Sequence, residues 1–364
     1  MSATHDSDIK ITILLAPPAG SKKGFGLTIY LVDKASNTLN GQRTMSFGDV
    51  EEINTAQTAG YISAAVASAL KVAFKQQNTP DAVLAGNVDL IVPETYKEAL
   101  VACLEDRSDF YGVTADLFGD TDDAKIVELG NDIEARELLF AFQSGAAALL
   151  SDTDPDNPTE GLSSLDGNER SIVCYHDTNS APMALGFLTR NLAFSPDERS
   201  NPWYAWIRGV DKYASQITSG QRTQALADHV NVGLEFGPSD FFVKPGHNLA
   251  GRPIYMIVTR DWFKARLQEW VSEKVVEYSE RGEKIPVSLR GQRILAGVVK
   301  KVFAQGIRNG HFKPDQTRII YPQITKQNLD DEEIPLEGEA TFAIGGQDVT
   351  MTFNFQRTDI IESE

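Results

Sequence analysis

The chain has 364 residues, of which 41% are hydrophobic and 23% charged, so it is long enough for two or three domains with apolar cores. Its net charge of −17 argues against a general nucleic-acid binder, because neutralising phosphates requires a basic surface. No apolar run reaches the eighteen or so residues of a membrane span, and residues 1–10 lack the pattern of a secretory signal. We therefore expect no membrane insertion and assembly in the cytoplasm, where the widely separated Cys103 and Cys174 stay reduced.

The charge is unevenly distributed. Residues 1–240 hold 17 Lys and Arg against 34 Asp and Glu, whereas residues 241–364 hold 17 of each. Within the neutral part, residues 284–326 contain nine cations and a single anion, Asp315. A basic block inside an acidic chain predicts two surfaces with different partners.

Strands and helices alternate through the first 240 residues. The predicted strands are residues 9–15, 27–32, 81–85, 110–115, 138–142 and 171–175. The predicted helices are residues 56–76, 93–106, 122–136 and 181–192. This alternation predicts an α/β fold with an open, mainly parallel sheet and flanking helices.

A smaller α+β domain is expected at the C-terminal end. Residues 254–258 read as an apolar strand that runs into a helix at Asp261. A second helix is expected to begin after Ser288, a plausible N-cap, and to stop at Asn309-Gly310. Residues 340–344 and 347–356 then predict a hairpin. The expected division is an N-terminal arm or strand (1–20), an α/β domain (21–244) and a C-terminal domain (245–364).

Motifs for catalysis or metal binding are missing. The five histidines form no HExxH pair, and no GxSxG sequence occurs. The glycines of residues 20–26 fit neither the Walker spacing nor the GxGxxG spacing of phosphate-binding loops. Asp152-x-Asp154-x-Asp156 begins like a calcium loop but lacks the required Gly and the closing Glu. We expect no catalytic, cofactor-binding or metal site, which favours a structural or binding role, although an α/β enzyme remains the alternative.

The predicted helix after Ser288 has a cationic face. At about 100° per residue its five cations fall within a sector about 100° wide, opposite an apolar side. They are Arg290, Arg293, Lys300, Lys301 and Arg308. Because the helix contains no acid, it has no i,i+4 ion pair of its own. The face is either a solvated surface or a contact for an acidic partner.

Strand patterns also occur near both ends of the sequence. The alternating apolar positions are Ile9, Ile11 and Ile13 in the first, and Val349, Met351, Phe353 and Phe355 in the second. Such strands can pair within their own fold or extend the sheet of a neighbouring subunit. The sequence pattern leaves both arrangements open, and we predict that one or both strands pair with strands of neighbouring subunits, because exposed strands would otherwise leave unpaired edges.

The order of several short motifs resembles one known family. They are Tyr61-Ile-Ser, Asp109-Phe-Tyr-Gly112, Arg170-Ser-Ile-Val-Cys-Tyr-His176, Thr259-Arg-Asp-Trp-Phe263, Lys284-Ile-Pro286 and the Asn309-Gly310 turn. Over most of residues 55–320 the chain resembles contractile tail sheath proteins of bacteriophages, in particular the compact group with little insertion.

The resemblance implies a mechanical function. A sheath subunit polymerises as stacked hexameric rings around a tail tube and contracts to drive the tube through the host envelope. The implied partners are further copies of the chain, the tube protein, and the baseplate and tail terminator proteins, and the implied location is the virion tail. The sheath of a headless, bacteriocin-like injection system would share every sequence feature described above, so it remains an alternative. The α/β domain is then expected outside, and the C-terminal domain near the tube with its cationic helix facing inward.

An acidic region is expected to face away from that tube. Residues 105–166 contain 16 acids against Arg107, Lys125 and Arg136. Repulsion within this region, which includes most of the loop at 152–168, is best relieved by solvent. We therefore expect it on the outer surface of the assembly.

Overall fold

The computed structural model describes residues 9–14, 24–90, 94–119, 121–151, 163–236, 240–344 and 348–356. The chain forms two compact units: residues 24–195 with 201–257, and residues 1–23 with 196–200 and 258–364. The main division therefore falls after Ile257, whereas the sequence-based division placed it after residue 244. A short segment, Pro196–Ser200, belongs to the smaller unit although the residues on both sides of it belong to the larger one.

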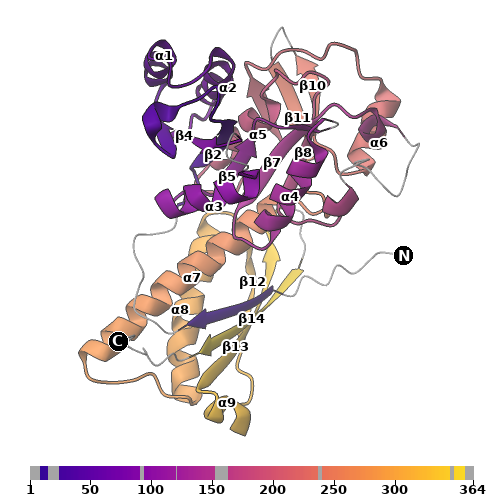
Figure 1. The fold of residues 1–364 in the computed structure, drawn as a ribbon. Helices are drawn as coiled ribbons and strands as arrows, with labels where there is room; N and C mark the ends of the chain where they lie inside the picture. The colour runs from indigo at the N-terminus through magenta and orange to yellow at the C-terminus, as the bar shows by residue number, and fades with distance from the viewer. Residues whose placement is uncertain are drawn as a thin grey trace. The chain divides into compact units, whose positions relative to one another are not determined.

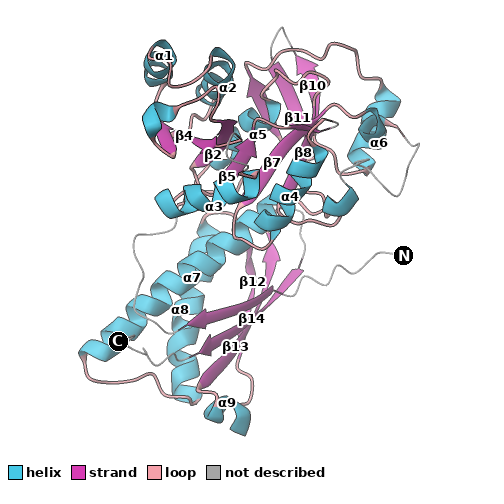
Figure 2. Ribbon diagram, viewed as in Figure 1, coloured by secondary structure: helices cyan, strands magenta, loops and turns pink. Residues whose placement is uncertain are grey.

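The larger unit is built around a seven-stranded sheet (Figure 2). Its strands are β2 (Thr28–Asp33), β3 (Thr44–Phe47), β4 (Val83–Val88), β5 (Gly112–Ala115), β6 (Phe118–Gly119), β7 (Leu139–Ser144) and β8 (Ser171–Tyr175). The spatial order is β3-β4-β2-β5-β7, with β6 and β8 also paired to β7, and only β3 is antiparallel. The parallel strands are continuous buried runs, as expected where helices cover both faces of a sheet.

Helices cover the two faces of this sheet. They are α1 (Val50–Thr58), α2 (Ala64–Phe74), α3 (Tyr96–Asp106), α4 (Asp123–Glu134) and α5 (Met183–Leu192). A further helix of this unit, α6 (Ser219–Ala227), contacts β10 instead. The α3 and α4 helices pack against each other and the sheet, whereas α2 and α5 form a second packed pair (Figure 1). Parallel strands with helical crossovers and a smaller α+β region confirm the predicted fold class.

A second, antiparallel sheet completes the larger unit. It contains β9 (Ala205–Arg208), β10 (Val232–Phe236) and β11 (Asp240–Lys244) in the order β10-β11-β9. A single parallel bridge, Cys174↔Asn231, joins its start to β8. The sequence patterns did not predict this sheet or α6.

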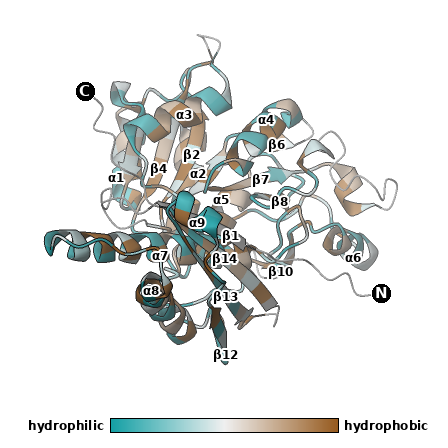
Figure 3. Ribbon diagram, turned by 90° about the horizontal axis from the view of Figure 1, so that it is seen from below, coloured by the Kyte–Doolittle hydropathy of each residue, from teal (hydrophilic) through white to brown (hydrophobic). Residues whose placement is uncertain are grey.

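The smaller unit packs two long helices on a four-stranded sheet (Figure 3). Its elements are β1 (Ile9–Leu14), α8 (Leu289–Arg308), β12 (Phe312–Ile320), α9 (Lys326–Asp330), β13 (Glu333–Phe342), β14 (Asp348–Gln356) and α7 (Ile254–Glu280) from Val258 onward. The sheet order is β1-β14-β13-β12. Phe263 of α7 joins helices and sheet, with ring centroids 4.8 Å from Phe303 and 5.9 Å from Phe353.

Two predicted elements were wrong. Residues 254–258 form the start of α7 rather than a strand, because this apolar run is buried as helix and its periodicity could not distinguish the two. The predicted helix at 56–76 is two helices, since Gly60 has a φ of +74° and ends α1. Ser63 then begins α2 by accepting a hydrogen bond from the Val66 amide.

The C-terminal predictions agree better with the structure. The hairpin is confirmed by antiparallel pairing of β13 with β14, although β13 begins at Glu333 rather than near residue 340. Gly345 and Gly346, the expected turn, lie outside the described residues, as do Pro93 and residues 152–162 of the acidic loop.

Candidate functional site

The α8 helix is amphipathic, with local signals that fix both of its ends. The Ser288 side chain accepts a hydrogen bond from the Gly291 amide at 3.5 Å, and Gly310, with a φ of +76°, follows the C-cap Asn309. One side of the helix is buried against the sheet of the smaller unit, including Leu295, Val299 and Val302. The predicted helix and its two ends are confirmed.

The five predicted cations lie on the other side of α8. Arg290, Arg293, Lys300, Lys301 and Arg308 are all exposed. In the part of the chain that the structure describes, none of them forms an ion pair with a carboxylate. Lys301 has an aromatic partner, because its Nζ lies 4.0 Å from the centroid of the Trp270 ring on α7. The structure therefore places these five cations on one face of α8, where no described carboxylate neutralises their charge.

The two terminal strands pair with each other within the chain. β1 lies parallel to β14 in the register Ile9↔Met351, Ile11↔Phe353 and Ile13↔Phe355. The predicted apolar side chains of β14 are buried, from Val349 at 2% exposed to Phe353 and Phe355 at 0%. β14 is thus flanked by β13 and β1, whereas β1 is an outer strand of the sheet. Pairing between subunits stays a prediction.

The smaller unit also contains a buried polar cluster that sequence analysis missed. Arg266 of α7, 1% exposed, forms two hydrogen bonds with the carboxylate of Asp197, at 2.8 Å from Nε and 2.7 Å from Nη2. Trp262 Nε1 donates to the same carboxylate at 2.9 Å. Asn309 donates to the backbone carbonyls of Pro196 and Asp197. The segment Pro196–Ser200 is therefore held against α7 and the end of α8.

His311 completes this cluster. Its ring is 2% exposed, with Nε2 2.6 Å from the Pro196 carbonyl oxygen and Nδ1 3.1 Å from Thr259 Oγ1. Burial lowers the pKa of His311, against the opposing effects of the Pro196 carbonyl and the Asp197 carboxylate. A neutral ring with one donor and one acceptor fits these two contacts.

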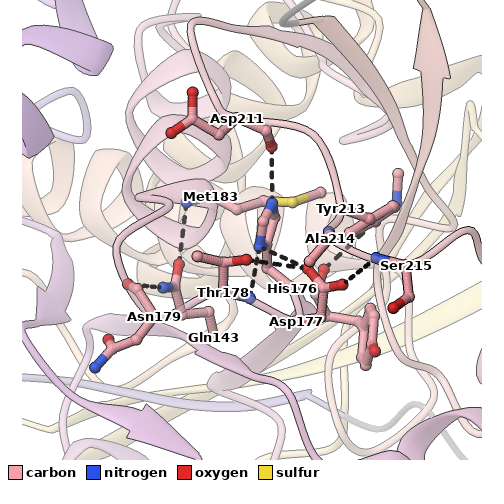
Figure 4. Close-up of polar contacts among 12 residues, drawn as sticks. Gln143, His176, Asp177, Thr178, Asn179, Met183, Asp211, Tyr213, Ala214 and Ser215 are labelled. Carbon is pink, nitrogen blue, oxygen red and sulfur yellow. Dashed lines mark hydrogen bonds and ion pairs between the residues drawn. The ribbon is translucent and has the colours of Figure 1, made fainter.

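A second polar cluster lies after β8 in the larger unit (Figure 4). His176 is fully buried, its Nδ1 accepts from the Thr178 amide at 3.1 Å, and its Nε2 lies 2.9 Å from the Asp211 carbonyl oxygen. Burial lowers the pKa of His176, so the ring is neutral and donates through Nε2. Asp177 accepts from the amides of Ala214 and Ser215. These contacts fix the loops after β8 and β9 and are structural in character.

A crevice of about 230 Å³ lies at the carboxyl ends of the parallel strands. The chain order reverses here, with β4 on one side of β2 and β5 on the other, which is where open α/β sheets bind ligands. Its lining includes Tyr30, Thr114, Gln143 and Asp211, and none of the described residues that line it is His or Cys. The Tyr30 hydroxyl, which lines the crevice, donates a hydrogen bond to the Asp116 carboxylate at 3.2 Å.

The two cysteines are both buried. Burial raises the pKa of the Cys103 thiol to about 11 and also raises that of Cys174, so both stay protonated at neutral pH. Within the described ranges no three His, Cys, Asp or Glu side chains are grouped as metal ligands. The search for membrane spans, over those same ranges, found no helix that is both long and apolar enough.

Comparisons with solved structures place this fold among contractile sheaths. The sheath tail protein of Listeria innocua aligns with a TM-score of 0.59 at 9% identity, covering 93% of this chain and 96% of that chain. The contracted helical sheath of the anti-feeding prophage gives 0.56 at 12% identity, over 94% of both chains. The contracted sheath complex of an extracellular contractile injection system gives 0.55 at 10% identity, over 100% of this chain and 94% of that one.

Sequence comparisons add nothing to this likeness. No protein-family model matches the sequence, and a search of curated proteins found no match. The chain has the sheath fold over almost its whole length, as the resemblance of its motifs predicted.

Proposed function

We propose that the chain is the structural subunit of a contractile sheath, which polymerises as stacked hexameric rings around a tube and drives the tube through an envelope by contracting. The observation that carries this proposal is the alignment of nearly the whole chain, both units included, with three sheath subunits. The likeness extends beyond the α/β sheet, a scaffold shared by many enzymes, to the smaller unit with its paired terminal strands.

The cationic face of α8 is the proposed contact with the tube. Its five exposed cations have no carboxylate partner in the described part of the chain, which suits an acidic surface outside the subunit. Each exposed pair contributes only about 0.2 to 1 kcal/mol, but repetition over many rings holds the extended sheath in register. Weak individual contacts also let the sheath leave the tube during contraction. The larger unit then lies outside, with the acidic region of residues 105–166 facing solvent.

The terminal strands are the proposed connections between subunits. The β1–β14 pairing within one chain supplies backbone hydrogen bonds that a neighbour's strand can make in the same register. Exchange of β1 between subunits would keep neighbours joined while each subunit rotates. Deleting residues 1–15 should then give a soluble, folded subunit that does not polymerise, as judged by circular dichroism and negative-stain microscopy. Normal tubes from this variant would contradict the exchange.

Two settings fit the proposed sheath. One is a phage tail, with tube, baseplate and tail terminator proteins as partners and the virion as the final location after assembly in the host cytoplasm. The other is a headless injection system, which is favoured by the likeness to the anti-feeding prophage and to an extracellular contractile injection system. Capsid genes beside the gene for this chain would favour the phage tail.

Electron microscopy of the purified chain tests the function directly. A sheath subunit forms rings or long tubes, whereas a small closed oligomer would contradict the proposal and favour an α/β enzyme. The tube contact is tested with Arg293→Glu combined with Lys300→Glu, because both side chains lie off the buried side of α8. A matched control is Arg208→Glu with Lys212→Glu, which changes the net charge equally at exposed sites of the larger unit. Only the α8 pair should weaken cosedimentation with tubes, and salt should weaken the wild type similarly.

A further inference from the structure

One glycine of α8 is not required by packing against the described residues of the subunit. A Cβ on Gly291 would lie 1.9 Å from the Pro286 carbonyl oxygen, and one on Gly306 would lie 2.7 Å from the Phe312 ring, so packing requires both glycines. A Cβ on Gly297 would meet no atom within 4 Å, and its φ is not in the left-handed region. A glycine inside a helix is unfavourable relative to alanine. The fold of the subunit therefore does not explain Gly297.

Gly297 opens onto a groove between α7 and α8. The groove has a volume of about 470 Å³ and is lined by Trp270, Glu273 and Tyr278 of α7 and by Ile294, Gly297 and Lys301 of α8. Trp270 and Ile294 are half-buried, and Lys301 Nζ lies 4.0 Å from the centroid of the Trp270 ring, so the apolar surface of the groove is Ile294 together with the part of Trp270 beside this ammonium group. Relative to Arg290, Gly297 falls at about 340°, inside the cationic sector of about 280° to 20°. The missing side chain thus lies in the middle of the cationic face.

The two rims of the groove carry opposite charge. On α8, Lys301 lies at the rim, and Arg293 and Lys300 are exposed on the same helix without a carboxylate partner among the described residues. On α7, Glu273 is exposed and also has no ion pair among the described residues. Glu277 accepts a hydrogen bond from Lys274 Nζ at 2.6 Å. A partner with carboxylates is attracted to the α8 rim and repelled from the α7 rim, which fixes the direction in which it docks.

We propose that this groove receives an apolar side chain of the tube subunit, which lies over Gly297 between Trp270 and Ile294, with carboxylates beside it paired to the cations of α8. This inference rests on the proposed function and adds an apolar anchor to a contact otherwise made of charges. Any side chain at position 297 would occupy the space that the anchor needs, which accounts for the glycine. An anchor in a pocket fixes position along a surface, whereas exposed charges alone tolerate sliding.

The test is cosedimentation of the full-length chain with tubes assembled from the tube subunit of the same particle. Gly297→Leu should weaken binding about tenfold or more, as expected for loss of one buried anchor. Gly297→Ala should weaken binding less while raising the Tm by about 2 °C, because alanine favours the helix and meets no neighbour. Greater stability with weaker binding is the opposite of what a structural defect would give.

Gly220→Ala is the matched control. Gly220 also lies in a helix, α6, with nothing within 4 Å of a Cβ and no left-handed φ, but it belongs to the larger unit. This variant should gain stability similarly and bind tubes like the wild type. If Gly297→Leu fails to fold, the difference in tube binding between Gly297→Ala and Gly220→Ala still tests whether position 297 contacts the tube.

The possible outcomes separate the groove from the proposed function. Normal binding by both Gly297 variants, with binding lost in the Arg293→Glu, Lys300→Glu variant, would overturn the apolar anchor and leave the cationic contact standing. Normal binding by all of these variants would overturn both. If Gly297→Leu instead blocked polymerisation of the chain without tubes, the occupant would be a second copy of the chain, and the assignment to the tube would be wrong.

Discussion

The two long helices of the smaller unit use their cations in opposite ways. On α7, Arg266 is buried in contact with Asp197 and Glu269, and Lys274 pairs with Glu277 at 2.6 Å. On α8, the exposed cations have no carboxylate partner among the described residues. Removing a cation from α7 should therefore damage the subunit itself, whereas removing one from α8 should damage only its contact with another molecule. Four changes test this difference, from the largest expected effect to the smallest.

Arg266→Met should have the largest effect. It leaves the Asp197 carboxylate without its two hydrogen bonds from Arg266, while the Trp262 indole of α7 still donates to it. Breaking a buried ion pair by removing one partner costs about 3 to 5 kcal/mol in the free energy of unfolding. Denaturant unfolding of the isolated chain measures this loss. An unchanged midpoint would show that the buried cluster does not hold the segment.

Acid should weaken the same cluster through His311. Its pKa is lowered in the folded chain, so the unfolded chain binds more protons once the pH falls below about 6.5, the ordinary histidine pKa. The stability contributed by the neutral ring is fully present above that pH and is lost as the pH falls toward the lower folded pKa. Unfolding curves between pH 7 and pH 5 should show this decrease, and His311→Asn should reduce its slope. Equal slopes for both proteins would exclude His311 as a contributor.

Ser288→Ala should have a smaller effect, at the start of α8. Its side chain accepts from the Gly291 amide, and losing such an N-cap costs about 1 kcal/mol. Thermal unfolding should detect the change, with Ser288→Asp as the control that keeps the cap. If the aspartate variant were as unstable as the alanine variant, the cap would not be the cause.

Lys300→Ala should have the smallest effect on stability. The side chain is exposed and forms no ion pair within the described part of the chain, so the free energy of unfolding should change by less than about 0.5 kcal/mol. A loss as large as that of Arg266→Met would mean that the α8 cations stabilise the subunit, and the difference between the two helices would disappear.

Local sequence signals predicted α8 well, while α7 shows where they fail. Ser288, Asn309-Gly310 and the segregation of cations from apolar residues act within a few residues of one another, so they fix the helix in any context. The start of α7 is an apolar run that fits a strand or a buried helix equally, and only packing within the fold decides. Gly60 ends α1, but the apolar periodicity on both sides of it led to the prediction of one continuous helix at residues 56–76.

Some features of the candidate site could likewise be predicted from local sequence, whereas others depend on contacts between distant residues. The cationic face could be predicted because the spacing of residues on a helix is set by the backbone alone. The Asp197–Arg266 contact joins residues 69 positions apart, and the groove at Gly297 needs α7 beside α8, so no local pattern contained either. Likewise the sequence marked β1 and β14 as strands, but their parallel pairing is a long-range contact.

The sequence by itself determined the alternating α/β pattern, the ends of α8, its positive face and the strand character of both terminal segments, because these depend on periodicity and capping over short distances. The tertiary structure decided that the Pro196–Ser200 segment joins the smaller unit and that Gly297 opens onto a groove. It also decided that Arg266 and Lys274 of α7 have carboxylate partners, whereas the α8 cations have none among the described residues. Those properties depend on which side chains meet across the fold, and burial of apolar surface brings them together regardless of their distance along the chain.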